Sequence, residues 1–251
     1  VSTTHSIVGG VMGAGIAAVG FELVNWPTMA AIAASWVISP VFGAACAAAL
    51  LFFMKKKILY TADRLAEARR WVPVLIALMA AAFAAYMAMK GLKKIWRPDF
   101  VEVAGFALAC AVAAFLWAKP YIARKTQTLT QSRSDLYTLF HIPLIAGAAL
   151  LSFAHGANDV ANAVGPLAAI VSTVGQNDGI AASVEIPFWV MTVGAFGIAL
   201  GLGLFGPKLI TVVGQKITRL NAMRAYCVAL SAAVTVSVSY THLRAHETNQ
   251  D

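Results

Sequence analysis

The chain has 251 residues, of which 60% are hydrophobic and 12% are charged, and its mean hydropathy is +0.75. A soluble domain carries about 45–50% apolar and about 25% charged residues, so this composition excludes a water-soluble domain, a coiled coil and a disordered chain. The net charge of +8 does not indicate nucleic acid, because the basic residues lie between apolar runs, where they set membrane topology.

Seven apolar runs predict membrane-spanning helices, because a span needs about 20 apolar residues. In chain order they cover residues 6–24, 28–54, 71–89, 100–118, 136–153, 187–206 and 223–239. The expected fold class is an all-α integral membrane protein with about seven transmembrane helices, surrounded by the lipid bilayer. The three cysteines lie inside these runs, which indicates no disulfide framework.

The basic residues between the runs predict the orientation of the chain. Links 55–70, 119–135 and 207–224 carry six, four and four Lys or Arg residues, whereas 90–99 carries four and 176–186 none. The first three links together carry 14 Lys or Arg residues and the other two carry 4. Because cytoplasmic links are enriched in Lys and Arg, the first three are expected inside and the other two outside, although link 90–99 weakens this bias. We expect a multi-pass protein of the bacterial inner membrane.

One segment does not fit a simple series of spans. Segment 136–175 connects link 119–135, which is expected inside, to link 176–186, which is expected outside, so it must make one net crossing. Its length, however, is about twice that of a spanning helix. The sequence therefore predicts a re-entrant or broken helix in this segment, with residues 155–175 as the re-entrant part.

That same segment carries a dense polar motif at membrane depth. It reads His155-Gly156-Ala157-Asn158-Asp159-Val160-Ala161-Asn162-Ala163-Val164-Gly165-Pro166. Asp159 is the one carboxylate well inside an apolar region, and a charge there is costly unless it meets a partner or a water-filled cavity. Gly156 and Pro166 can unwind the backbone around it. The alternative is that Asn158, Asp159 and Asn162 only join helices through hydrogen bonds.

A second polar cluster opens the chain with Ser2, Thr3, Thr4, His5 and Ser6. Hydroxyls before a helix can cap it, and its free N–H groups together with the helix dipole favour an anion. An ordinary N-cap is the alternative for this stretch taken alone.

Together the two clusters resemble the signature motifs of the inorganic phosphate transporter (PiT) family. Residues 1–9 resemble its STTH motif, and 156–163 resemble its GAND motif. Residues 35–40 after the first motif and 165–170 after the second support the resemblance, which extends from residue 1 to about 239. In that family two inverted repeats each carry one motif of either kind, and all four meet at the centre.

The resemblance implies a chain that corresponds to the middle of such a transporter. Residues 1–135 would hold the remainder of the first repeat with its STTH motif, together with central spans and cytoplasmic links. Residues 136–239 would hold part of the second repeat with its GAND motif. Residues 240–251 resemble an adaptor-derived, non-native tail. The other two motifs would lie before Val1 and after about Ser239, and this chain alone should not transport.

The resemblance implies secondary active transport of inorganic phosphate coupled to Na⁺ or H⁺, with no cofactor and no enzymatic activity. Hydroxyls of Ser2, Thr3 and Thr4 can donate to an oxyanion without a buried cation. Asp159 can coordinate Na⁺ with oxygens of Asn158 and Asn162, or accept the proton that phosphate retains near neutral pH. We therefore expect substrate-binding residues Ser2, Thr3, Thr4, Asn158 and Asp159, and cation-coupling residues Asp159 and Asn162.

Other functions remain open at this point. One is a permease for another oxyanion such as sulfate, or for a metal–phosphate complex. A remote alternative is an intramembrane metalloenzyme using His155 and Asp159, which share a helical face, although zinc requires three or four ligands. His5 and His155 are alternative proton carriers. Whether the protein forms a homo-oligomer is also open.

Overall fold

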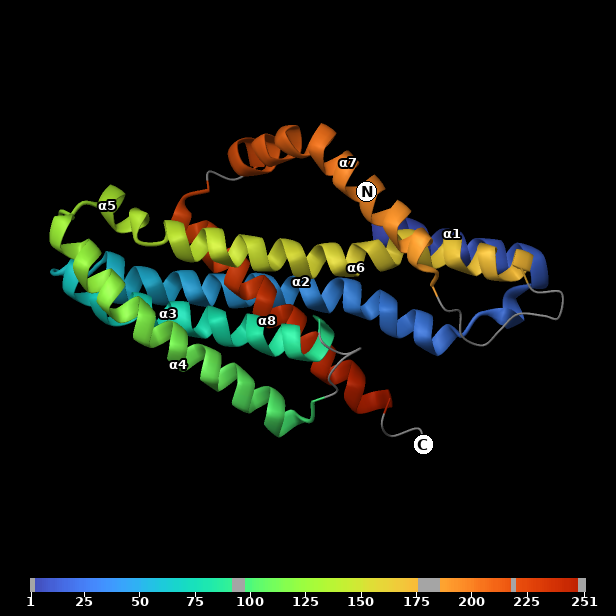
Figure 1. Cartoon of the computed structure of the whole chain (residues 1–251), viewed down its shortest axis with the longest axis horizontal. Helices are drawn as coiled ribbons and strands as arrows, with labels where there is room; N and C mark the ends of the chain where they lie inside the picture. Colours follow the sequence, from blue (N-terminus) through green and yellow to red (C-terminus); the bar gives the residue numbers. More distant parts are fainter. Residues whose placement is uncertain (1–2, 92–97, 176–185, 218–219, 248–251) are drawn as a thin grey trace. The chain divides into compact units, whose positions relative to one another are not determined.

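The computed structural model describes residues 3–91, 98–175, 186–217 and 220–247, and within these ranges some side chains, including those of Thr3, His155 and Asn158, are not described. The described residues are helical apart from short links (Figure 1). The long helices are α1 (Thr3–Val19), α2 (Trp26–Met54), α3 (Arg64–Tyr86), α4 (Phe100–Lys125), α6 (His141–Gly175), α7 (Phe188–Thr211) and α8 (Ala222–Glu247). The short helices are η1 (Phe21–Leu23), η2 (Lys55–Leu59), η3 (Met87–Gly91), η4 (Thr126–Thr128), α5 (Arg133–Thr138) and η5 (Val212–Ile217).

Each apolar run coincides with one long helix, which confirms the all-α prediction. Five helical stretches within the described ranges are long and apolar enough to cross a membrane. They cover Trp26–Leu59, Arg64–Met89, Phe100–Thr128, Arg133–Phe153 and Phe188–Gln215. The apolar parts of α1 (Thr4–Val19) and α8 (Ala222–Thr235) are shorter. The all-α membrane fold is confirmed, whereas the predicted number of about seven transmembrane helices stays a prediction.

Polar residues at the helix starts explain where α3 and α4 begin. The carboxylate of Asp63 accepts a hydrogen bond from the amide of Ala66 at 3.0 Å, so α3 begins seven residues before the apolar run. Asp99 and Glu102 form a reciprocal capping box at the start of α4, with distances of 2.8 and 3.1 Å. Such caps satisfy backbone donors that the first helical turn leaves unpaired.

The described residues divide into two compact units. Unit 1 contains residues 1–36 and 155–219, and unit 2 contains residues 37–154 and 220–251. Both α2 and α6 contribute to both units, and α6 passes from one to the other between Ala154 and His155, directly at the polar motif. This division differs from the expected boundaries at 135 and 239, which follow the chain order of the family's repeats and stay a prediction.

Unit 2 is held by an apolar core between α3, α4, α8 and the beginning of α6. Tyr226 of α8 is fully buried, its hydroxyl donates a 2.6 Å hydrogen bond to the carbonyl of Leu75, and its ring lies 5.5 Å from that of Phe140. Gly147 of α6 lies directly against Met79, because a Cβ placed there would be 2.6 Å from the methionine sulfur. These contacts fix α6 and α8 against α3.

The links 55–70 and 119–135 meet at one end of unit 2. Gln131 donates to Asp63 at 2.9 Å, and Arg64 donates through Nη1 to the carbonyl of Gln131 at 2.7 Å. Arg69 donates to the hydroxyl of Thr126 at 2.6 Å. These bonds place both basic links on the same side of the unit, as the predicted topology requires. Which side faces the cytoplasm stays a prediction.

The prediction of a broken helix at Gly156 and Pro166 is wrong. Helix α6 is continuous over 35 residues, which corresponds to about 52 Å and exceeds the roughly 30 Å of a bilayer core. Pro166 removes the backbone donor that would bond to the carbonyl of Asn162, and a glycine weakens a helix only slightly. The backbone hydrogen bonds of the residues on either side keep α6 helical at both positions. The re-entrant course of residues 155–175 stays a prediction.

Candidate functional site

The two polar motifs both lie in unit 1, one on α1 and the other on the second part of α6. Helix α1 begins at Thr3, so Thr4 lies in its first turn and is half-buried. Ser2 lies outside the described residues, and the side chain of Thr3 is not described. Their predicted roles as phosphate ligands stay predictions.

On α6 the motif places polar side chains three residues apart. Asp159 and Asn162 are both half-buried, and this spacing puts them on the same face of the helix. The side chains of Asn158 and His155 are not described, so their predicted contribution to a phosphate, cation or metal site stays untested. The predicted role of Asp159 in binding phosphate or a cation stays a prediction.

One hydrogen bond joins the two motifs. The side-chain amide of Asn162 donates to the hydroxyl oxygen of Thr4 at 3.3 Å, between residues that are 158 positions apart in the sequence. Helix α1 and the second part of α6 lie side by side in Figure 1. The structure thus brings together Thr4 and Asn162, two of the predicted site residues, from opposite parts of the chain.

A contact between two aromatic rings holds the residue next to Thr4. The imidazole of His5 lies edge-on against the indole of Trp36, with ring centroids 3.8 Å apart and an interplanar angle of 65°. Trp36 belongs to the part of α2 that lies in unit 1 and is half-buried. Sequence reasoning did not connect these residues. A hint was available, since Trp36 is the tryptophan that lies well inside an apolar run rather than near its end.

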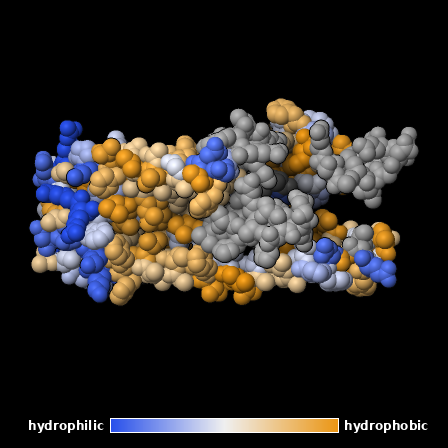
Figure 2. Space-filling view, turned by 90° about the horizontal axis from the view of Figure 1, so that it is seen from below, coloured by the Kyte–Doolittle hydropathy of each residue, from blue (hydrophilic) through white to orange (hydrophobic). Residues whose placement is uncertain are grey.

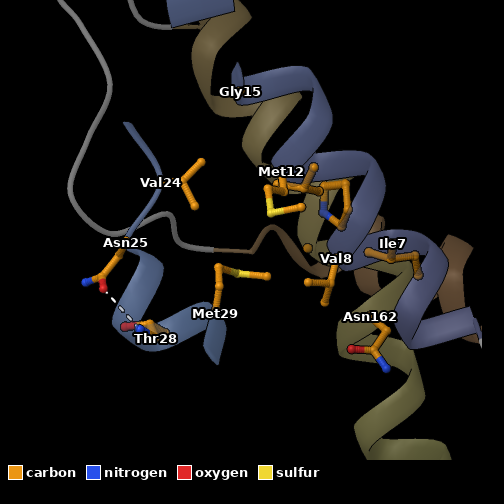
Figure 3. Close-up of a pocket in the computed structure, with 12 residues that line it drawn as sticks. Ile7, Val8, Met12, Gly15, Val24, Asn25, Thr28, Met29 and Asn162 are labelled. Atoms are coloured by element: carbon orange, nitrogen blue, oxygen red, sulfur yellow. Dashed lines mark hydrogen bonds between the residues drawn. The ribbon is translucent and has the colours of Figure 1, made fainter. Parts of the chain in front are cut away.

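A cavity of about 550 Å³ extends from Asn162 between α1, the start of α2 and α6 (Figure 3). Helix α1 lines it with Ile7, Val8, Val11, Met12 and Gly15, the start of α2 and the link before it with Val24, Asn25, Thr28 and Met29, and α6 with Asn162, Gly165 and Pro166. The amide of Thr28 donates to Asn25 at 3.1 Å, so this pair also caps α2. Sequence reasoning missed this cavity, because its apolar residues belong to three separate helical segments.

The chemistry of the cavity differs between its wall and its polar end. Most of the twelve lining residues are apolar, and none carries a charge. An apolar wall cannot replace the hydration of an oxyanion. Asn162, which lines one end of the cavity and bonds to the hydroxyl of Thr4, marks a place where amide and hydroxyl groups can supply hydrogen bonds without a buried cation. The polar end is therefore the part of the site that suits an oxyanion.

A small second core holds the C-terminal part of α6, after the polar motif. Val164 and Ala168 of α6 pack with Val190 of α7, and all three are buried. Asn162 lies half a turn before Val164 on the same helix. The core therefore fixes the helix that carries the motif, within the same unit.

Comparison with known proteins identifies the family. The profile of the phosphate transporter family matches residues 1–244. A protein of Helicobacter pylori strain J99, named as a phosphate permease, is 47% identical over 97% of this chain and 48% of its own length. One of Pyrococcus abyssi, also named as a phosphate permease, is 33% identical over 95% of this chain and 58% of its own length.

A solved structure agrees with these relatives. It is described as the sodium-dependent phosphate transporter, and it superposes with a TM-score of 0.82 at 33% identity, over 95% of this chain and 58% of that chain. The chain spans about half the length of the curated relatives it matches. The two joined motifs, the helical fold and these similarities lead to one conclusion: this chain belongs to the phosphate transporter family and is part of a multi-pass integral membrane protein.

Proposed function

We propose that the protein containing this chain transports inorganic phosphate across the membrane by cation-coupled symport. The observation that carries the proposal is the hydrogen bond between Asn162 and Thr4. It joins the family's two kinds of motif in one unit, beside half-buried Asp159. Family membership supports phosphate as the substrate, and supports a transporter rather than a metalloenzyme built on His155 and Asp159.

The proposed division of labour follows from the donor types. The hydroxyls of Ser2, Thr3 and Thr4 and the amide of Asn158 donate to phosphate oxygens. Asp159 accepts a hydrogen bond from the protonated oxygen of monohydrogen phosphate or, with Asn162, coordinates the cation. Sulfate keeps no such proton, so its charge would face the carboxylate without a hydrogen bond. Phosphate is therefore preferred over sulfate.

We propose Na⁺ as the coupling ion, with no further cofactor. The structurally similar protein is described as sodium-dependent, and it shares 33% of its residues with this chain. Carboxylate and amide oxygens are suitable ligands for such a hard cation. The proposed location is the inner membrane of a bacterium.

The test uses the full-length protein that contains this sequence, purified and reconstituted in liposomes. Uptake of radiolabelled phosphate is measured with an inward gradient of Na⁺, K⁺ or choline, each at two external pH values. We expect uptake that depends on Na⁺ and is not reduced by excess sulfate. If a pH gradient drives uptake in choline without Na⁺, the coupling ion is H⁺ and the proposal of Na⁺ is wrong. Equal competition by sulfate would contradict the assignment of phosphate as the preferred substrate.

A further inference from the structure

The end of unit 2 where links 55–70 and 119–135 meet, here called the basic end, carries many more positive than negative side chains. Its positive residues are Lys55, Lys56, Lys57, Arg64, Arg69, Arg70, Lys119, Arg124, Lys125 and Arg133, and its negative residues are Asp63, Glu67 and Asp135. In Figure 2 hydrophilic residues gather at this end, while apolar residues cover the helices next to it. Family membership alone does not explain what this charge binds.

The three carboxylates are already engaged in hydrogen bonds within the protein. Asp63 accepts from Ala66 and Gln131, and Glu67 accepts from the indole of Trp71 at 3.0 Å. Asp135 accepts from the amide and hydroxyl of Thr130 at 2.8 and 2.5 Å. Over the described residues of the two links, the structure shows no ion pair between these carboxylates and the basic side chains. The positive charge of this end is therefore left for an external anion.

Aromatic rings lie beside several of the basic side chains. The Nζ atom of Lys56 lies 5.8 Å from the centroid of the Phe52 ring, and Phe52 is 67% exposed. The guanidinium of Arg70 lies 5.5 Å from the Trp71 ring. On α4, the ring of Trp117 stacks on that of Tyr121 at 5.3 Å, one turn before Arg124 and Lys125. Aromatic rings prefer the level of the lipid headgroups, so the cations next to them reach the phosphate layer.

From this arrangement we propose that the basic end binds the headgroups of anionic phospholipids in the leaflet that surrounds it. A phospholipid presents a phosphate at the level of the Lys and Arg side chains, next to aromatic rings that lie at the headgroup interface. Lys55, Lys56 and Lys57 are consecutive residues of one helical turn, so their side chains point in different directions and suit a charged surface rather than a single small anion. Contributions of basic residues near such a surface add together and decline within a Debye length.

The test measures selectivity for phospholipid headgroups in the purified protein, reconstituted in phosphatidylcholine bilayers. Spin-labelled phosphatidylglycerol and phosphatidylcholine are compared by electron paramagnetic resonance, which gives the fraction of each lipid held at the protein surface. We expect association of phosphatidylglycerol to exceed that of phosphatidylcholine at least about twofold at low salt. The preference should disappear near about 0.5 M NaCl, where charges are strongly screened. Equal association of both lipids at low salt would overturn the proposal.

Matched variants locate the site. Replacing Lys55, Lys56 and Lys57 together by Gln should abolish most of the preference, whereas replacing all three by Arg should retain it. A control replaces Lys90, Lys93 and Lys94 by Gln, which removes the same charge from the link at the other end of α3 and should leave the preference intact. If the control variant loses as much of the preference for phosphatidylglycerol as the first variant, the basic end is not the lipid-binding site.

Free phosphate is distinguished in the same experiment. Addition of about 10 mM inorganic phosphate, matched in ionic strength with NaCl, should leave the lipid preference unchanged. Loss of the preference in phosphate alone would assign the cluster to a small soluble anion and contradict the proposal. If the Gln variant fails to insert into the bilayer, the salt dependence of the unmodified protein and the lipid preference of the Arg variant still test whether positive charge at the basic end binds the headgroups. Neither measurement depends on transport, so failure here leaves the proposed function unaffected.

Discussion

Asn162 on α6 donates a 3.3 Å hydrogen bond to the hydroxyl of Thr4 on α1. The bond links two motifs that lie near opposite ends of the chain, and it leaves the hydrogen of the Thr4 hydroxyl to donate elsewhere. The Thr4 hydroxyl can therefore accept from Asn162 and donate to a further partner at the same time.

The first prediction concerns this pair in the full-length protein. Thr4→Val and Asn162→Ala should each raise the KM for phosphate, and their effects should be less than additive because each removes the same interaction. A hydrogen bond of this kind contributes about 0.5–1.5 kcal/mol, or roughly two- to tenfold in affinity. Phosphate uptake by the two single variants and the double variant gives the coupling. Full additivity would show that the two residues act separately.

The second prediction concerns Asp159. Asp159→Asn keeps the size of the side chain but removes its charge and one acceptor oxygen. If the carboxylate coordinates the cation or accepts the proton of phosphate, uptake per inserted protein should fall at least about tenfold, or about 1.4 kcal/mol. Radiolabelled phosphate uptake across a cation series measures this. Near-parental uptake with unchanged cation dependence would instead make Asp159 a residue that only joins helices.

The third prediction concerns the contact between His5 and Trp36. Because their rings are 3.8 Å apart, Trp36 holds the first turn of α1, which also carries Thr4. An aromatic contact contributes about 0.5–1.5 kcal/mol, so Trp36→Ala should raise the KM for phosphate several-fold while Trp36→Phe should largely preserve it. The exposed neighbour Val37 provides the control Val37→Ala, which should leave the KM unchanged. If Trp36→Ala raises the KM for phosphate by the same factor in a His5→Ala background as in the unmodified protein, the ring contact does not have this role.

The fourth prediction concerns the core of unit 2. Tyr226→Phe removes the hydroxyl that donates to Leu75 at 2.6 Å and should lower the free energy of unfolding by about 0.5–1.5 kcal/mol. Tyr226→Ala also leaves a cavity and should cost about 3–5 kcal/mol. Unfolding in mixed micelles, followed by circular dichroism, measures both. A loss for Tyr226→Phe as large as that for Tyr226→Ala would mean that the hydroxyl rather than the ring carries the stability.

The fifth prediction concerns the pH dependence of the α3 cap. Hydrogen bonds from the amide of Ala66 and the side chain of Gln131 hold the pKa of Asp63 below its ordinary value of 3.8. The folded state therefore favours the charged carboxylate, so its contribution to stability is present above pH 3.8 and is lost as the pH falls through the lowered pKa. Asp63→Asn keeps a capping oxygen and should show a smaller loss of thermal stability below pH 4. Thermal unfolding across this pH range measures the difference, and identical profiles for Asp63→Asn and the unmodified protein would contradict the prediction.

The sequence by itself determined the membrane class, the helices and the two motifs. Hydropathy is a local property, so the seven apolar runs mark the long helices of the residues that the structure describes. The motif residues Thr4, Asp159 and Asn162 could be identified for the same reason. Their polar side chains stand out beside the apolar runs, wherever those runs lie in space.

Only the tertiary structure decided which of these residues meet. The Thr4–Asn162 bond, the His5–Trp36 contact and the cavity between α1, α2 and α6 join segments far apart in the chain. The continuity of α6 through Gly156 and Pro166 was also decided there, because a helix tolerates one missing backbone donor when its neighbours remain bonded. Local residue preference cannot show this outcome, since it depends on the packing of a whole helix against distant partners.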